Sequence, residues 1–359
     1  MAGLENRNTL VGLQYVRAIA VIFVVIDHIN IVIGLEKYIG RRIINVDNLF
    51  LGAIGVNVFF VLSGFIMVFI SLDAKSLAPK VSVKLFFLRR IERIVPFLWF
   101  CVAAYAALRF FARDGEADWW AYIRAAFFFP YGTINPTQAW TLRYEMLFYT
   151  IFAFWIAFPL VGRYFVVLWV ASPMILSVLS LSAPADFLFT PINILFGLGA
   201  AIGIIYKLRP WVFRNSNLSV AIIALAFCGA NFLYSIISYS HYLISTVVYS
   251  CSLSALIIVI AVGVCPIGVP SLKFRFLAFL GDASYSIYLT HGIFLSALAG
   301  ISSHYLRQFP LPAIYTLILA AALAGGALIH VYIERPIIAV LRNVSKRSWK
   351  LDAVGTNPH

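Results

Sequence analysis

Two residues in the first apolar stretch of the chain, Arg17 and His28, have a spacing that suits chemistry on one helix face. They are 11 positions apart, and at about 100° per residue this separation ends about 20° past three full turns. Both side chains therefore project from the same face, about 16 Å apart along the helix axis. A fixed cation can bind an anionic group, and a titratable imidazole can move a proton. Asp27 points about 100° away and could pair with a neighbouring helix.

Two more ionisable residues, Glu145 and His291, are predicted to lie at the depth of His28, because each belongs to a separate apolar stretch at a comparable distance from its outer end. A carboxylate beside an imidazole fixes the tautomer of the ring and stabilises the imidazolium, as a general base requires. An alternative for Glu145 is an ion pair with Arg143 or with a periplasmic arginine that only holds helices together. For His291, a packed and hydrogen-bonded histidine is an equally good interpretation. His330, near the inner boundary, is expected to cap a helix or to pair with nearby charges.

Three arginines form a second group on the expected inner side. Arg89, Arg90 and Arg93 end the most basic loop, just before Pro96 begins the third apolar stretch. Arg90 and Arg93 are three positions apart and would face together on a helix. With Arg17 they could surround an anionic group, because guanidinium groups match the geometry of phosphate. The alternative is that they are basic anchors that touch anionic lipid.

Small residues occur in two other apolar stretches. Ser63 belongs to GVNVFFVLSGF at 55–65, which lacks the Gly-x-Ser-x-Gly turn of a hydrolase, so a helix–helix hydrogen bond is the simpler interpretation. Gly199 and Gly203 form a GxxxG pattern that predicts close helix packing. The cysteines show no metal-ligand or disulfide spacing, so we expect packing residues and no metal site; they are Cys101, Cys228, Cys251 and Cys265.

The composition identifies the elements that must position these residues. Of the 359 residues, 62% are hydrophobic and 11% are charged, and the mean hydropathy is +0.94. Such a chain could not cover its surface in water, which excludes a soluble enzyme, a nucleic-acid-binding domain and a disordered protein. Long unbroken apolar runs predict an all-α, polytopic membrane bundle rather than a barrel. The net charge of +13 then fits basic loops on the cytoplasmic side.

About ten stretches are long enough to cross a membrane. About 18 Lys and Arg residues fall on one side and about 7 on the other, which predicts both termini in the cytoplasm. The stretch 119–130 is short and begins with paired Trp, so we expect an interfacial or re-entrant helix. We predict one membrane domain, 1–342, and a polar cytoplasmic tail, 343–359. The ten expected spans are 11–33 (retained, not a cleaved signal), 50–71, 94–112, 140–160, 164–181, 187–206, 218–237, 243–265, 276–299 and 312–333.

Several motifs, in order along nearly the whole chain, resemble the integral-membrane acyltransferase-3 family, which includes bacterial polysaccharide O-acetyltransferases. They are Arg17-x10-His28, FFVLSGF at 59–65, RRIERIVP at 89–96, AWTLRYEMLFY at 139–149, GDASYSIYLTH at 281–291 and ERP at 334–336. The resemblance implies transfer of an acyl group, usually acetyl from acetyl-CoA, to a sugar hydroxyl, in a bacterial inner membrane. It also implies that the Arg–His pair of the first span is the essential motif, that Arg90 and Arg93 form the family's Arg-x-x-Arg, and that Glu145 is its carboxylate after the Trp.

Together these arguments predict a site with three groups of residues. The catalytic group is His28, Glu145 and Asp27. The group that binds acetyl-CoA, the acyl donor, is Arg17, Arg90, Arg93 and Arg89. Ser63, Trp140 and His291 are polar residues of substrate-binding or structural role. Direct transfer with His28 as general base and a covalent acetyl-histidine both remain open.

The expected partners are acyl-CoA, a glycan or lipid-linked sugar and the bilayer, but no nucleic acid. A second copy of the chain or polysaccharide-assembly proteins are further candidates. We expect no appended extracellular esterase-like domain, so the membrane domain or a partner would complete the transfer.

Two other classes of protein compete with the acyltransferase. In a proton-coupled transporter, Arg17, His28 and Glu145 would form a relay, although the chain shows no inverted repeat. A scaffold in an export complex would need no acetyl-CoA, and replacement of His28 would leave glycan acetylation unchanged.

Overall fold

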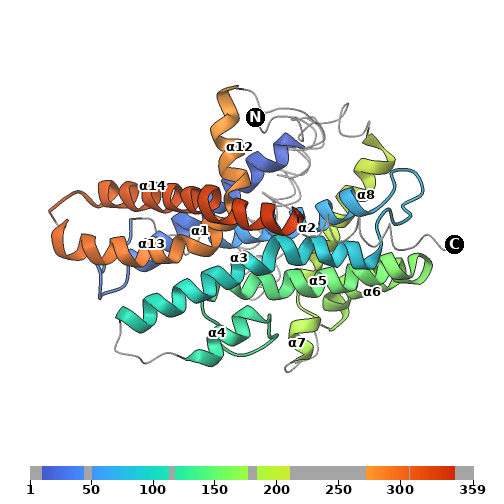
Figure 1. Cartoon of the computed structure of the whole chain (residues 1–359), viewed down its shortest axis with the longest axis horizontal. Coiled ribbons are helices and arrows are strands. Elements are labelled where there is room, and N and C mark those ends of the chain that lie inside the picture. Colours follow the sequence, from blue (N-terminus) through green and yellow to red (C-terminus); the bar gives the residue numbers. More distant parts are fainter. Residues whose placement is uncertain are drawn as a thin grey trace, which may run out of the picture.

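The structure is a computed structural model that describes residues 10–43, 51–112, 118–176, 184–210, 272–306 and 308–343. These residues form a bundle of helices with no strand (Figure 1). Six helical segments among them are long and apolar enough to cross a membrane, so the prediction of a polytopic membrane bundle is confirmed. The expected spans 218–237 and 243–265, and the tail after residue 343, lie outside the described residues. The count of ten spans and the cytoplasmic termini stay predictions.

Three helices pack closely because glycines face backbone atoms: α1 (Val11–Ile33), α2 (Leu51–Ser71) and α8 (Ile192–Leu208). A Cβ atom added at Gly64 would lie 2.0 Å from the Phe196 carbonyl oxygen, and one at Gly199 would lie 1.9 Å from the Val61 carbonyl oxygen. Helices α2 and α8 can therefore touch backbone to backbone. The packing role predicted for the GxxxG pattern is confirmed. A short helix, α7 (Ala185–Leu188), precedes α8.

The third long helix corrects the prediction for the basic segment. Helix α3 runs from Val83 to Ala112 with Pro96 inside it, whereas the sequence predicted a loop that ends at Pro96. The basic segment is therefore helical, because charged residues near the end of a membrane helix can reach the interface without breaking it. Proline inside a membrane helix is tolerated where neighbouring helices compensate.

The middle of the chain follows the prediction more closely. Helix α4 (Trp119–Ala126) is short, as expected for the stretch that begins with paired Trp. A 3-10 turn, η2 (Thr137–Ala139), leads into α5 (Trp140–Ala157), which packs along α6 (Pro159–Leu176). Figure 1 shows α3 and α5 crossing the centre of the bundle above α4.

The expected span 276–299 is wrong as a single helix. A 3-10 turn, η4 (Leu272–Phe274), and helix α12 (Arg275–Asp282) precede a break at Ala283, after which α13 runs from Ser284 to Tyr305. Helix α12 points away from α13 (Figure 1). It crosses α1 so closely that a Cβ at Gly281 would lie 2.0 Å from the Gln14 carbonyl oxygen. Hydropathy alone does not register such a break, since the stretch stays apolar on both sides.

The last helix contains one irregular turn. Helix α14 (Leu311–Ile329) continues through a π-helical turn, η5 (His330–Glu334), into further helix that ends at residue 343. Helix α14 lies beside α13 and also contacts α1 (Figure 1). Single π turns inside α-helices occur often at functional positions.

Candidate active site

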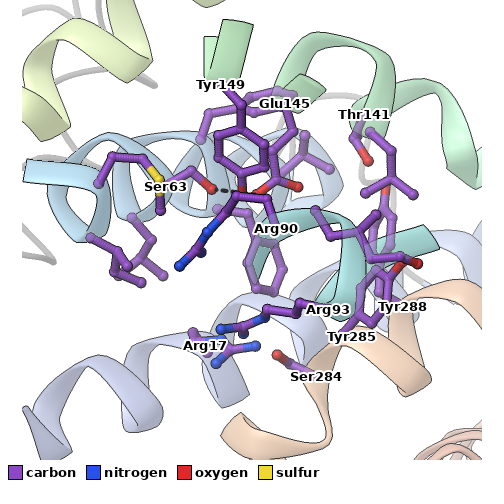
Figure 2. Close-up of a pocket in the computed structure, with 18 residues that line it drawn as sticks. Arg17, Ser63, Arg90, Arg93, Thr141, Glu145, Tyr149, Ser284, Tyr285 and Tyr288 are labelled. Carbon is purple, nitrogen blue, oxygen red and sulfur yellow. Dashed lines mark hydrogen bonds between the residues drawn. The ribbon is translucent and has the colours of Figure 1, made fainter. Parts of the chain in front are cut away.

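A pocket lies where α1, α2, α3, α5 and the first turns of α13 meet (Figure 2). It contains about 850 Å³ of space between the side chains, part of it open to solvent. Most of its wall is apolar. Its polar groups converge from five helices: Arg17, Ser63, Arg90, Arg93, Thr141, Glu145, Tyr149, Ser284, Tyr285 and Tyr288.

Three arginines give this pocket a strong excess of positive charge. Arg17 from α1 meets Arg90 and Arg93 from α3, and Figure 2 shows the guanidinium groups of Arg17 and Arg93 beside one another. Arg90 is buried, with 8% of its surface exposed and its Nε without a partner among the described residues. Arg17 donates a hydrogen bond to Gln14 Oε1 at 3.3 Å. The structure therefore brings three of the four predicted donor-binding arginines together, whereas Arg89 is exposed and does not line this pocket.

Glu145 faces these arginines rather than His28. Its Oε1 accepts hydrogen bonds from the hydroxyl of Ser63, at 2.9 Å, and from that of Tyr149. The expected contact with His28 is not made, because one helix turn places Glu145 and Tyr149 on the same side of α5, against α2 and α3. The alternative ion pair with Arg143 is not formed either, since Arg143 Nη2 donates to the Gly132 carbonyl oxygen at 3.0 Å.

The first turns of α13 close the pocket on the side opposite Glu145. Ser284 is fully buried, and its hydroxyl lacks a partner among the described residues. The hydroxyl of Tyr285 donates to the Ile94 carbonyl oxygen at 2.9 Å, and that of Tyr288 donates to the Gln138 carbonyl oxygen at 3.2 Å. The sequence prediction missed all three. The break at Ala283, which the polar residues around it could have suggested, is what places them here.

His28 and His291, for which the sequence predicted a similar depth, lie together beyond the pocket. Their ring centroids are 5.0 Å apart, with the rings at 72°. The ring of Tyr288, which lines the pocket, is 6.0 Å from that of His291. His28 Nδ1 is 2.8 Å from the Val24 carbonyl oxygen. Because a carbonyl oxygen only accepts, Nδ1 carries the hydrogen in the neutral ring, and Nε2 is left with the free lone pair.

Two other predicted site residues lie apart from this pair. The carboxylate of Asp27 is against the backbone of Gly52 in α2, where an added Cβ would be 2.4 Å from its Oδ2. Trp140 is 38% exposed and packs against the rings of Phe60 and Tyr144. Neither residue makes a hydrogen bond or ring contact with His28 among the described residues.

A buried polar network near the pocket was not predicted as a unit. Glu334 Oε2 accepts a hydrogen bond from Ser286 at 2.5 Å and another from His330 Nδ1 at 2.5 Å. Arg335 Nε donates to His330 Nε2 at 3.0 Å, so His330 is neutral with its hydrogen on Nδ1. The prediction that His330 pairs with nearby charges is confirmed. The network ties the start of α13 to the π turn.

The chemistry of the pocket suits an anion better than a metal ion. Among the described residues, no group of three His, Cys, Asp or Glu side chains could hold a metal. Arg90 is buried, and none of the three arginines forms an ion pair with a carboxylate of the described residues. A buried guanidinium group without such a pair is costly, and an anionic ligand offsets that cost. The arginines, with the hydroxyl of Ser284, are the residues that could hold phosphate groups. Cys101, the cysteine among the described residues, is buried and packs in the core, whereas the other three lie outside them.

Comparison with known proteins gives a consistent result. The acyltransferase-3 family model, an acyltransferase domain, matches residues 10–331. The exopolysaccharide production protein ExoZ of Rhizobium meliloti is 30% identical over 304 residues, which cover 80% of this chain and 90% of that protein. The O-acetyltransferase OatA of Staphylococcus aureus is 28% identical over 167 residues, 42% of this chain but 25% of OatA.

A third relative, named putative peptidoglycan O-acetyltransferase YrhL, comes from Bacillus subtilis. It is 29% identical over 179 residues, which cover 45% of this chain and 25% of YrhL. No solved structure matches the chain. The family match extends from the first helix, with Arg17 and His28, to the π turn, and so includes every residue of the pocket. The chain belongs to the acyltransferase-3 family of integral-membrane acyltransferases.

Proposed function

We propose that this protein transfers an acetyl group from acetyl-CoA to a hydroxyl of a surface or exported glycan, with Nε2 of His28 as the general base. Family membership makes the chain an acyltransferase and disfavours the transporter and the scaffold. The names of the relatives, exopolysaccharide production protein and O-acetyltransferase, support O-acetylation of a polysaccharide. The donor and the base are inferred from the pocket and from the histidines beyond it.

The single observation that carries the proposal is the order of groups along α1. Arg17 lines the positively charged pocket, and His28 projects from the same helix face about 16 Å further on. In an acyl-CoA the pantetheine arm places about twelve bonds between the phosphates and the thioester. Four residues of extended polypeptide contain the same number of backbone bonds, so the extended arm is about 13–14 Å long. Phosphates held by the arginines would therefore place the thioester near His28.

His28 can serve both proton transfers of the proposed acyl transfer. His28 Nε2 removes the proton from the acceptor hydroxyl as the oxygen attacks the thioester carbonyl. The C–S bond then breaks, and the proton on His28 passes to the departing thiolate. Arg17, Arg90 and Arg93 hold the donor in place, and Glu145 keeps Ser63 and Tyr149 ordered at the pocket wall.

Inverted membrane vesicles test the proposal. We would prepare them from a strain that lacks the gene for this protein but still makes its own glycan. The strain would express the wild-type protein, the His28→Gln variant or a matched control variant. The control is His304→Gln, which changes an exposed histidine on α13. With [1-¹⁴C]acetyl-CoA we expect label in the glycan for the wild type and the control, and a loss of about 10²- to 10⁴-fold for His28→Gln, the range of one general base.

Three outcomes would count against the proposal as stated. Equal labelling by His28→Gln and the wild type would remove His28 as the base. A wild type that labels glycan from another acetyl donor but not from acetyl-CoA would remove the donor. Acetyl label on His28, detected by mass spectrometry after a rapid quench near neutral pH in the absence of acceptor, would replace direct transfer by an acetyl-histidine intermediate.

A further inference from the structure

His291 is the most deeply buried histidine among the described residues and has an unused nitrogen. None of its surface is exposed. Its Nδ1 lies 2.6 Å from the Tyr288 carbonyl oxygen and 3.2 Å from that of Ile287. Its Nε2 is buried without a hydrogen-bond partner among the described residues. Buried polar atoms are seldom left unpaired, so this nitrogen calls for an explanation.

The backbone contacts fix which kind of partner is missing. A carbonyl oxygen only accepts, so Nδ1 of His291 carries the hydrogen and Nε2 is a bare acceptor. The nearby hydroxyls are already committed: Tyr288 donates to the Gln138 carbonyl oxygen and Tyr105 donates to the Leu289 carbonyl oxygen. What Nε2 lacks is therefore a hydrogen-bond donor, and the neighbouring tyrosines do not supply it.

The neighbouring ring is His28, which is in the same tautomer. With its Nδ1 bound to the Val24 carbonyl oxygen, neutral His28 also presents a lone pair at Nε2. Two neutral rings 5.0 Å apart in this state cannot satisfy each other. The situation changes once His28 takes a proton, because its Nε2 then becomes a charged donor.

We propose that His291 is a positioning residue whose Nε2 accepts a hydrogen bond from protonated His28, directly or through one water molecule. This proposal rests on the proposed role of His28 as the base. The proton still moves from the acceptor hydroxyl to His28 and then to the thiolate, and His291 keeps its own hydrogen throughout. Its effect is to orient and stabilise the imidazolium while the tetrahedral intermediate exists, as a fixed acceptor does in other general-base sites.

The surroundings of His291 hold it rigidly, as such a role requires. The next residue, Gly292, lets the side chain of Gln138 lie against α13, since an added Cβ would be 2.3 Å from Gln138 Nε2. Gln138 Nε2 also donates to the hydroxyl of Tyr105 at 3.4 Å. The turn that carries His291 is therefore clamped by η2 and α3.

A pair of amide variants separates this role from simple packing. Asn at position 291 can reproduce the Nδ1 contact with the backbone but has no atom at the position of Nε2, whereas Gln reaches that position with an acceptor oxygen. In the vesicle assay we expect His291→Asn to lower kcat about 10- to 100-fold, the scale of a hydrogen bond to a charged group, with the KM for acetyl-CoA within about twofold. We expect His291→Gln to recover at least part of this activity, and His304→Asn, on the same helix, to behave as the wild type.

The outcomes distinguish this inference from the proposed function. Wild-type kcat in His291→Asn, or equal losses in the Asn and Gln variants, would overturn the role of His291 while His28 stays the base. A rise in KM without a change in kcat would also overturn it, because donor binding would then be affected. An active His28→Gln variant would instead refute the proposed base, and the role of His291 with it. Protein amounts in the vesicles, measured by immunoblot, normalise every rate.

Discussion

Replacement of Arg93 by Gln tests whether the positively charged pocket binds the donor. Arg93 lines the pocket beside Arg17, whereas Arg89, one turn earlier on the same helix, is exposed and outside it. Arg89→Gln removes the same charge from nearly the same depth of α3 and is therefore the matched control. We expect Arg93→Gln to raise the KM for acetyl-CoA and Arg89→Gln to leave it nearly unchanged.

The magnitude follows from the strength of the hydrogen bond that Arg93 would donate to a phosphate oxygen. A hydrogen bond to a charged group contributes about 1.5–3 kcal/mol, which corresponds to an increase in KM of about 13- to 160-fold. The phosphates do not change during acyl transfer, so this binding is uniform in the ground and transition states. The kcat should therefore stay within about threefold. Arg93→Lys keeps the charge without the bidentate geometry, and its KM should fall between those of the wild type and Arg93→Gln.

The assay is the vesicle reaction with increasing [1-¹⁴C]acetyl-CoA, at two salt concentrations. Because attraction between a cationic pocket and phosphates is screened by salt, the wild-type KM should rise with ionic strength, and the Arg93→Gln KM should rise less. Equal KM values for Arg93→Gln and Arg89→Gln would refute the reasoning. So would a decrease confined to kcat, because Arg93 would then act at the reacting bond.

Three further changes probe the scaffold and the network. Gly199→Leu should lower the apparent Tm in detergent, since its side chain would meet the backbone of α2. Gly300→Leu should lower it much less, because an added Cβ there would make only an ordinary contact, at 3.9 Å, with Cε1 of Tyr38; equal Tm values would contradict the packing argument. Glu334→Gln should cost about 1–3 kcal/mol of stability, because the buried acceptor of two hydrogen bonds loses its charge, and an unchanged thermal unfolding curve would contradict this. Ser63→Ala should lower labelling less than about tenfold, since Tyr149 still donates to Glu145; a complete loss of labelling would give Ser63 a direct part in transfer.

The helices of this protein could be predicted well because lipid leaves the backbone few alternatives. Apolar stretches of sufficient length must be helical, and α1 begins and ends as predicted, at residues 11 and 33. The errors fall where hydropathy carries no information. The start of α3 at Val83 and the break at Ala283 depend on local charge, on packing against other helices and on the close crossing near Gly281.

The site was predictable only as far as one helix determines it. The shared face of Arg17 and His28 follows from helical periodicity, and so does the pairing of Arg90 with Arg93. The neighbours of Glu145 do not follow from helical periodicity. The depth estimated from the sequence put Glu145 beside His28, whereas the packing of α5 against α2 puts it beside Ser63. Contacts between separate helices depend on their rotation and crossing, which a single sequence does not specify.

The break before α13 gives the pocket and the histidine pair a common geometry. Along α1 the chain passes from Arg17 in the pocket to His28, and along α13 it passes from Ser284 in the pocket to His291. The two helices therefore run in the same direction from the pocket to the histidine pair. At 1.5 Å per residue, the axial distance is about 16 Å from Arg17 to His28 and about 10 Å from Ser284 to His291. A continuous helix through 276–299 would have to keep the direction of α12, which crosses α1 at Gly281 and Gln14. It is the break that lets α13 follow α1 from the arginines to the histidines, so one pair of helices sets both the place of an anionic group and the place of the base.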